Sequence, residues 1–146
     1  MIVNIDKYEE VYSVLKKYLT DPETNPYNPS VTKLYKATID KKKFPLITIE
    51  EITNTLSQRT LGGNESISTV VYEINIYAIN KIINKEEVGN MTIARQLSAL
   101  VDNVLGEHFR MRRLYNSPTP NIDTTIYRIT MRYEKNLFDN RGKFIN

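Results

Sequence analysis

The sequence predicts an α+β fold: a small mixed or antiparallel sheet of about four strands, with an N-terminal helix and one long amphipathic helix packed on it. Two segments carry apolar residues at helical spacing, and several others alternate as strands do. They follow one another as helix, strands, helix, strands, without the regular alternation that is typical of a parallel sheet. The 146 residues fit a single domain over 1–146 with one hydrophobic core.

The first predicted element is an amphipathic helix from Asp6 to Leu19, for which Asp6 is a candidate N-cap. Three prolines and several capping-type residues follow over Asp21–Ser30, so we expect a mobile loop at 21–30. The segment from Val31 to Phe44 is either a short strand or irregular, and it ends in the lysine run Lys41–Lys43. A run of lysines is most often a solvated loop, and an anionic partner is the lesser interpretation.

Two strands are predicted in the middle of the chain. Phe44–Ile52 is rich in β-branched residues, which follow Pro45, a residue that fits only the start or the edge of a strand. Ser68–Ile79 alternates most clearly and is expected to be central in the sheet. Between them, residues 54–68 are polar with Gly62 and Gly63 at the centre, which predicts a long hairpin arm or a mobile loop.

The C-terminal half is predicted to hold the long helix and two further strands. The helix spans Glu86–Leu105, with acids at its start and Gly106 placed to end it. Strands are expected over Phe109–Asn116 and Thr124–Phe138, joined by a proline-containing turn. In the second strand, alternation places one row of apolar and aromatic side chains on the core face and the arginines on the other face. The core row is Thr125, Tyr127, Ile129, Met131 and Tyr133, and the opposite row includes Arg128 and Arg132.

Several function classes are disfavoured by composition. The chain has no cysteine, which excludes disulfides and thiolate metal ligands, and His108 is its only histidine. No nucleophile motif or P-loop is present, and Gly62-Gly63 lacks the strand and helix context of a phosphate cradle. The glutamates fall on separate predicted elements. We therefore expect a protein that is not an enzyme, with no catalytic residues, no cofactor and no metal.

The sequence also predicts the cellular compartment in which the protein acts. The N-terminus carries acids where a signal peptide needs a basic flank, and no apolar run approaches the roughly 20 residues of a membrane span. We expect a protein that acts in the cytoplasm without contacting a membrane. The net charge is only +3, but seven of the eight arginines lie in the C-terminal half.

The arginines of the last two strands are the strongest candidate contact residues. Three interpretations are open for them: a solvated strand face, a phosphate-binding surface, or salt bridges between the subunits of an oligomer. A sheet that binds nucleic acid should carry aromatics and cations on the same face, whereas alternation places Tyr127 and Tyr133 opposite Arg128, and no RNP-type signature is present. The candidate residues are Arg110, Arg112, Arg113, Arg128 and Arg132.

From Val70 onward, the sequence resembles phage tail terminator (tail completion) proteins over about half the chain. The resemblance is carried by the strand around Tyr72-Glu73-Ile74, the amphipathic helix after it, and the turn Pro120–Asp123 leading to Tyr127-Arg128 and Arg132-Tyr133. Their order and spacing together carry the inference.

The resemblance implies a small α+β subunit that forms a hexameric ring at the head-proximal end of the tail tube. Such a ring stops tail polymerisation and offers the docking surface for the head connector. The implied partners are further copies of the chain, the tail tube protein, connector or neck proteins and, in a contractile tail, the sheath protein. DNA would only pass through the ring. The protein would be a virion component assembled in the host cytoplasm.

If the chain is such a protein, the five arginines are hypothetical contacts between subunits. The segment Asn54–Ser68, with Gly62 and Gly63, and the loop Asp21–Ser30 are hypothetical contacts to the tube or connector. The nearest alternative is a neck or head-completion ring protein, which acts as a head–tail adaptor. A basic module that binds nucleic acid ranks below both.

Overall fold

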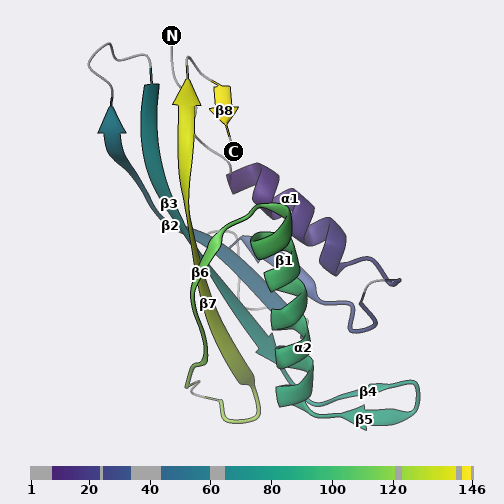
Figure 1. The fold of residues 1–146 in the computed structure, drawn as a ribbon. Helices are drawn as coiled ribbons and strands as arrows, with labels where there is room; N and C mark the ends of the chain where they lie inside the picture. The colour runs from purple at the N-terminus through teal and green to yellow at the C-terminus, as the bar shows by residue number, and fades with distance from the viewer. Residues whose placement is uncertain are drawn as a thin grey trace.

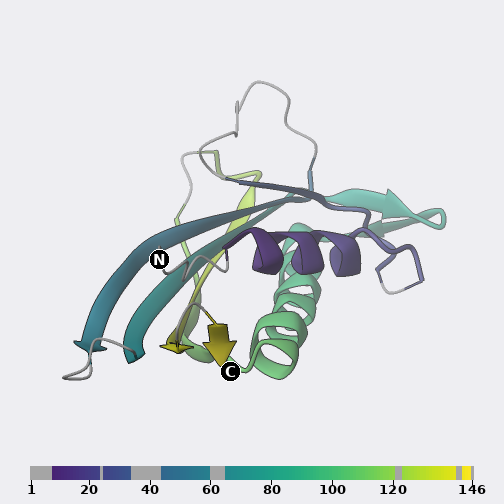
Figure 2. The ribbon, with the colours of Figure 1, turned by 90° about the horizontal axis from the view of Figure 1, so that it is seen from above.

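The computed structural model describes residues 8–23, 25–33, 44–59, 65–120, 123–140 and 143–145. For 54–59, 65–66, 137–140 and 143–145 the description is limited to the backbone. Within these ranges the chain forms two helices on one side of a twisted, mixed sheet, and a small separate hairpin (Figures 1 and 2). The predicted α+β fold is confirmed.

The main sheet has six strands, two more than expected, because a short early strand and the chain's last residues also pair. Its order is β1-β2-β3-β7-β6. Strand β8 pairs with the C-terminal end of β7, beyond the part that pairs with β6. The pairing of β1 with β2 is parallel, and all the other pairings are antiparallel. The strands are β1 (Ser30–Lys33), β2 (Leu46–Arg59), β3 (Glu65–Ala78), β6 (Arg112–Pro118), β7 (Tyr127–Asn140) and β8 (Lys143–Ile145).

Strand β3 lies at the centre of the sheet, as its alternation predicts. One of its faces is completely buried and packs beneath the helices. Strand β7 continues that face with three buried residues, so the predicted inward row of β7 is also confirmed from Ile129 onward. The buried residues are Val70, Tyr72, Ile74, Ile76 and Ala78 of β3 and Ile129, Met131 and Tyr133 of β7.

Both helices contribute an apolar stripe to this core. Helix α1 (Tyr8–Leu19) buries three residues spaced four apart, and α2 (Asn90–Asp102) buries positions that share one face of the helix. Because Asp6 lies outside the described residues, its role as N-cap stays a prediction. Among the described residues, no helix is both long and apolar enough to span a membrane. The inward residues are Val11, Leu15 and Leu19 of α1 and Ile93, Ala94, Leu97, Ser98 and Val101 of α2.

The predicted start of the long helix is wrong. Glu86–Val88 is strand β5, which pairs with β4 (Lys81–Ile83) around the turn residues Asn84 and Lys85. Both turn residues have positive φ, 52° and 67°, as a two-residue hairpin turn with the matching twist requires. The acids that suggested a helix N-terminus therefore belong to a hairpin, and the helix begins only at Asn90.

The predicted end of the helix is also wrong. Gly106 does not end it, because the chain continues through the π-helical segment η2 (Asn103–His108). The Phe109 N–H donates to the Val104 carbonyl, and the Met111 N–H donates to the Leu105 carbonyl. The residue that takes the left-handed conformation is Arg110, with φ 55°, so the chain turns there into β6.

Three strands are much longer than the helices that cover them. β2, β3 and β7 each have 14 residues, or roughly 45 Å at the rise of a strand. Helices of 12 and 13 residues span only about 20 Å. The strand ends therefore extend past the helices (Figure 1). We call this part, residues 54–59, 65–69 and 136–140, the arm. Most of 54–68 is thus paired strand, which fits the hairpin interpretation, while Gly62 and Gly63 lie outside the described residues.

The loop at 21–30 is irregular up to Ser30, where β1 begins. Its start is tied to the helix, because Asn25 is buried and its amide donates to the Leu19 carbonyl at 2.9 Å. Tyr27 is also buried and its hydroxyl contacts Gln96 of α2. The mobility predicted for the loop at 21–30 stays a prediction. Lys41–Lys43 lie outside the described residues.

Candidate interaction surfaces

The five candidate arginines do not form one cluster. Arg128 and Arg132 lie on the sheet face that points away from the helices, and Arg112 pairs with Glu134 at the edge of that face. Arg113 is on the opposite face and pairs with Asp102 of α2. Arg110 is exposed at the turn before β6. A register shift between Arg113 and Tyr115 changes the alternation within β6.

The two arginines of β7 on the polar sheet face have hydrogen-bonding partners within the chain. Asn75 is only 4% exposed, and its Oδ1 accepts hydrogen bonds from Arg128 Nε at 3.0 Å, Arg128 Nη2 at 2.9 Å and Thr130 Oγ1 at 2.8 Å. Arg132 Nη2 lies 3.2 Å from Glu73 Oε1. Both arginines are therefore already held by partners on β3.

Two tyrosines share this polar face with the arginines. The Arg128 guanidinium lies 5.3 Å from the Tyr77 ring centre, and that of Arg132 lies 5.7 Å from the ring of Tyr115. The prediction that Tyr127 and Tyr133 lie opposite Arg128 is confirmed, because Tyr133 is buried in the core and Tyr127 packs against it. That prediction did not cover Tyr77 and Tyr115. The alternation of β3 already placed Tyr77 on the outer face, and the shift in β6 explains why Tyr115 joins it.

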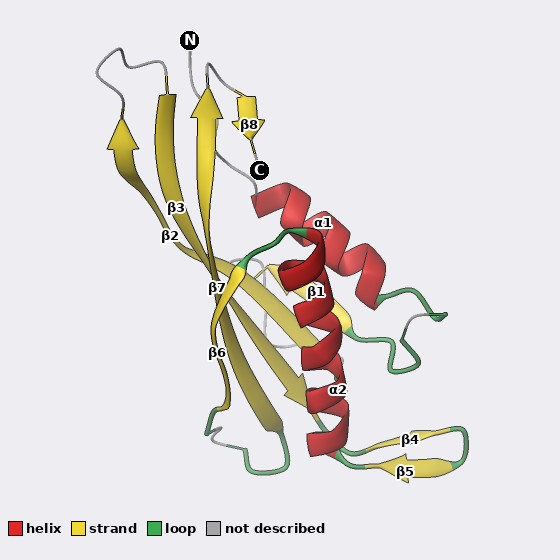
Figure 3. Ribbon diagram, viewed as in Figure 1, coloured by secondary structure: helices red, strands yellow, loops and turns green. Residues whose placement is uncertain are grey.

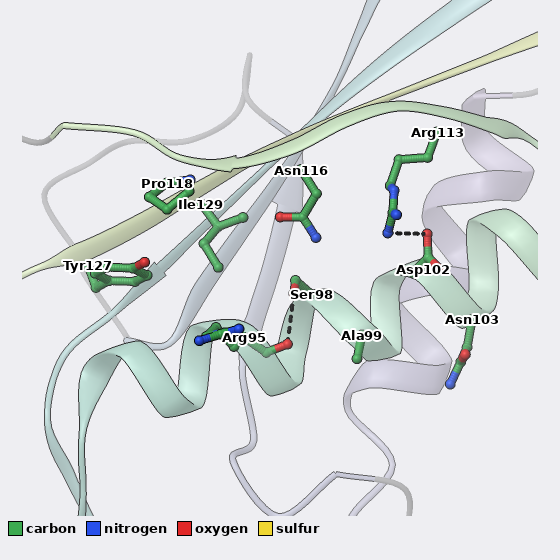
Figure 4. Close-up of a pocket in the computed structure, with 10 residues that line it drawn as sticks. All are labelled: Arg95, Ser98, Ala99, Asp102, Asn103, Arg113, Asn116, Pro118, Tyr127 and Ile129. Carbon is green, nitrogen blue, oxygen red and sulfur yellow. Dashed lines mark hydrogen bonds and ion pairs between the residues drawn. The ribbon is translucent and has the colours of Figure 1, made fainter.

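A second surface is a groove of about 680 Å3 between α2 and the strands β6 and β7. Figure 4 shows Arg95 near Tyr127 and Pro118 at one end, and the Arg113–Asp102 pair at the other. We call it the α2–β6 groove. Its lining residues are Arg95, Ser98, Ala99, Asp102, Asn103, Arg113, Asn116, Pro118, Tyr127 and Ile129.

Asp102 organises one end of this groove. Its Oδ1 accepts a 2.6 Å hydrogen bond from the Tyr133 hydroxyl and lies 3.5 Å from Arg113 Nη1. Burial, together with this bond to the carboxylate, raises the pKa of Tyr133 well above its ordinary value, so the hydroxyl stays protonated.

At the other end, Arg95 is exposed and makes no ion pair within the described part of the chain. Reasoning from the strands alone missed it. The signal was available in the helix, where Arg95, Ala99 and Asp102 share one face at spacings of four and three.

The β6 strand borders the groove and is one edge of the sheet. All seven of its residues are exposed, and in the described residues it pairs only with β7. A free strand edge of this kind is a potential contact for another chain.

The β4–β5 hairpin is a third exposed feature. It projects from the start of α2, on the side away from β6 (Figures 1 and 3). Ile82 at its end is 73% exposed, and Glu86 and Glu87 are exposed beside it.

The predicted absence of catalytic and metal sites stays a prediction. Among the described residues, no group of three or more His, Asp or Glu side chains could hold a metal ion. His108 is exposed and packs edge-on against Phe109, with ring centres 4.7 Å apart. The register does bring Glu50 opposite Glu73, two of the glutamates expected on separate elements.

No known protein-family model matches this chain, and no curated protein matches it either.

Proposed function

We propose that this protein is a structural component of a phage tail, which forms a ring at the head-proximal end of the tail tube. There it would stop tail polymerisation and offer the docking surface for the head connector. The proposal starts from the resemblance of the C-terminal half to tail terminator proteins. The structural observation that carries it is the presence of two different exposed surfaces, the α2–β6 groove and the β4–β5 hairpin, on opposite sides of α2.

A ring of identical subunits needs such a pair of surfaces. A contact between two unlike surfaces is heterologous, and repeated copies then form a ring if the rotation closes. The strand β6, which borders the groove, and the hairpin lie on opposite sides of α2 (Figures 1 and 2). A subunit of this shape therefore meets one neighbour with each side.

The arm supports a second kind of contact. It extends beyond the helix-covered core, so it can reach a protein above or below the ring without disturbing the core. We assign it to the tail tube or the connector.

The arginines predicted to bridge subunits have a smaller part in the proposal. Arg112, Arg113, Arg128 and Arg132 each have a partner in their own chain. Only Arg110 among the five has no such partner in the described residues. A contact through the other four would have to share or replace these partners.

Electron microscopy of particles from a producer strain that lacks this gene tests the function. Irregular, overlong tails without heads are expected for a tail terminator. Tails of normal length beside unjoined, filled heads would move the protein to the neck, as a head-completion ring. Particles like those of the wild type would overturn a role in virion assembly.

One observation favours a second candidate, a surface for single-stranded nucleic acid. Tyr77 and Tyr115 lie with Arg128 and Arg132 on the polar sheet face, and aromatics beside cations are what base stacking and phosphate contacts use. Against it, Glu73 pairs with Arg132 and Glu134 pairs with Arg112, so two of these cations already have an acidic partner in the chain. Binding of a labelled oligonucleotide that falls steeply with salt would support this candidate.

A further inference from the structure

The β4–β5 hairpin and the α2–β6 groove are complementary in charge and in their apolar side chains. The hairpin presents an acid beside an exposed apolar side chain, and the α2–β6 groove presents an unpaired arginine beside an apolar wall. Neither set has a partner within the described residues of its own chain. The groove of one copy can therefore receive the hairpin of another.

Contacts with the core fix the position of the hairpin and hence of its outer face. Its inner residues Ile83 and Val88 pack against the core, and Lys81 Nζ donates to the Tyr27 carbonyl at 3.1 Å. The pairing sets Ile82 directly opposite Glu87, so these two side chains lie on the same, outward face. Ile82 is 73% exposed on this hairpin, so its side chain is available to a partner.

The groove offers the matching chemistry at the end next to Arg95. Arg95 lines this part of the groove together with Tyr127 and Pro118, which give it an apolar lining (Figure 4). The other end is already neutralised by the Arg113–Asp102 pair. An entering carboxylate is therefore directed to Arg95.

We propose that the β4–β5 hairpin of one copy docks into the α2–β6 groove of a second copy, with Glu87 paired to Arg95 and Ile82 packed against Tyr127 and Pro118. The occupant is another copy of this chain, because Glu87 and Arg95 are of opposite charge and the hairpin projects from α2 on the side away from β6, which borders its own groove. The contact is heterologous, so each copy receives one hairpin and donates one. This inference deepens the proposed ring and rests on it for its biological setting.

Disulfide cross-linking tests the docking, and the chain is suited to it because it contains no cysteine. Ile82→Cys marks the hairpin and Ala99→Cys marks the exposed helix face in the groove. The purified full-length variants are oxidised and run on a non-reducing gel. A mixture of the two single variants is expected to give a heterodimer only, whereas the double variant gives a ladder of multimers.

The controls separate this contact from random collision. The matched variant pairs Ile82→Cys with Glu10→Cys, an exposed residue of α1 that lies outside the groove, and it should cross-link at least about tenfold less. Glu87→Arg or Arg95→Glu in the double-cysteine chain should lower the ladder by a similar factor. Combining both reversals should restore it, because the pair is only exchanged.

The outcomes distinguish this inference from the proposed function. Absence of the ladder, or equal cross-linking by Ile82→Cys alone, overturns the docking even if gene deletion gives overlong tails. A ladder that responds to the charge exchange supports the docking, even if gene deletion leaves the particles unchanged and the tail role fails.

Discussion

Removing the Tyr133 hydroxyl tests whether Asp102 anchors the sheet to α2. Tyr133 is 0% exposed and its hydroxyl donates to Asp102 Oδ1 at 2.6 Å. Tyr133→Phe deletes this hydrogen bond and keeps the ring that packs in the core. Tyr133→Phe therefore removes one hydrogen bond and leaves no cavity as large as a methyl group.

The expected cost is about 1.5 kcal/mol of unfolding free energy. A hydrogen bond to a charged group contributes about 1.5–3 kcal/mol. The lower end applies here, because the Asp102 side chain is 41% exposed and water can partly replace the lost donor. For a domain of this size the melting temperature should fall by roughly 3–6 °C.

Urea denaturation of four proteins measures the bond directly: the wild type, Tyr133→Phe, Asp102→Ala and the double variant. Asp102→Ala also removes the pair with Arg113, and the cycle subtracts that contribution. We expect a coupling energy near 1 kcal/mol between the two positions. A coupling below about 0.3 kcal/mol would refute the assigned bond.

Tyr133→Phe should also change how steeply the free energy of unfolding falls with pH in the alkaline range. The pKa of Tyr133 is raised in the folded state from its ordinary value of 10.0, so the folded protein keeps a proton that the unfolded chain releases. Its contribution is complete below about pH 10 and is lost as the pH rises above it. The wild type should lose up to about 1.4 kcal/mol per pH unit more than Tyr133→Phe, since one proton is involved. Parallel alkaline limbs would contradict this.

Three further predictions concern the fold and the surface. Asn75→Leu should destabilise the protein by about 2 kcal/mol in urea, because Arg128 and Thr130 lose a buried acceptor, whereas Asn75→Asp keeps the acceptor and should cost much less. Lys85→Gly should raise stability by roughly 0.5–1 kcal/mol, since residue 85 has a φ of 67° that glycine adopts without strain, and an unchanged melting temperature would contradict that. Arg113→Glu should reduce ring assembly on tails if this arginine contacts a neighbour, and normal tail lengths in micrographs would remove it from the interface.

The regular parts of the fold were predictable because burial alternates cleanly there. In β3 every second side chain from Val70 to Ala78 is fully buried, and a pattern with period two leaves little choice of face. Helix α1 was predictable for the same reason, with buried residues at Val11, Leu15 and Leu19.

The errors arose where a local turn overrides the pattern. Asn84 and Lys85 adopt positive φ without glycine, so nothing marked Glu86–Val88 as a strand. Gly106 looked like a helix end, but the left-handed residue is Arg110 four positions later. In both cases the chain reverses at residues other than glycine, which the pattern of apolar residues does not mark.

The candidate surface was predictable only in part. Alternation separated the arginines of β7 correctly from the core, but their partners Glu73 and Asn75 are on β3, more than fifty residues away. The groove joins α2 to an edge strand, and its unpaired cation, Arg95, is on the helix. Pairings at such a distance in sequence follow from sheet register, which the sequence alone did not fix.

The size of the proposed docking contact leads to a last prediction, about the free protein. One hairpin face with Ile82 and Glu87 is far smaller than the standard interface of about 1,600 Å2, so each contact alone should be weak. Copies held side by side on a template gain effective concentration, and weak contacts then suffice to close a ring. Sedimentation at micromolar concentration should therefore find mainly monomers, and added tail tubes should deplete them. A hexamer that persists at nanomolar concentration would require a larger interface than the hairpin and groove provide.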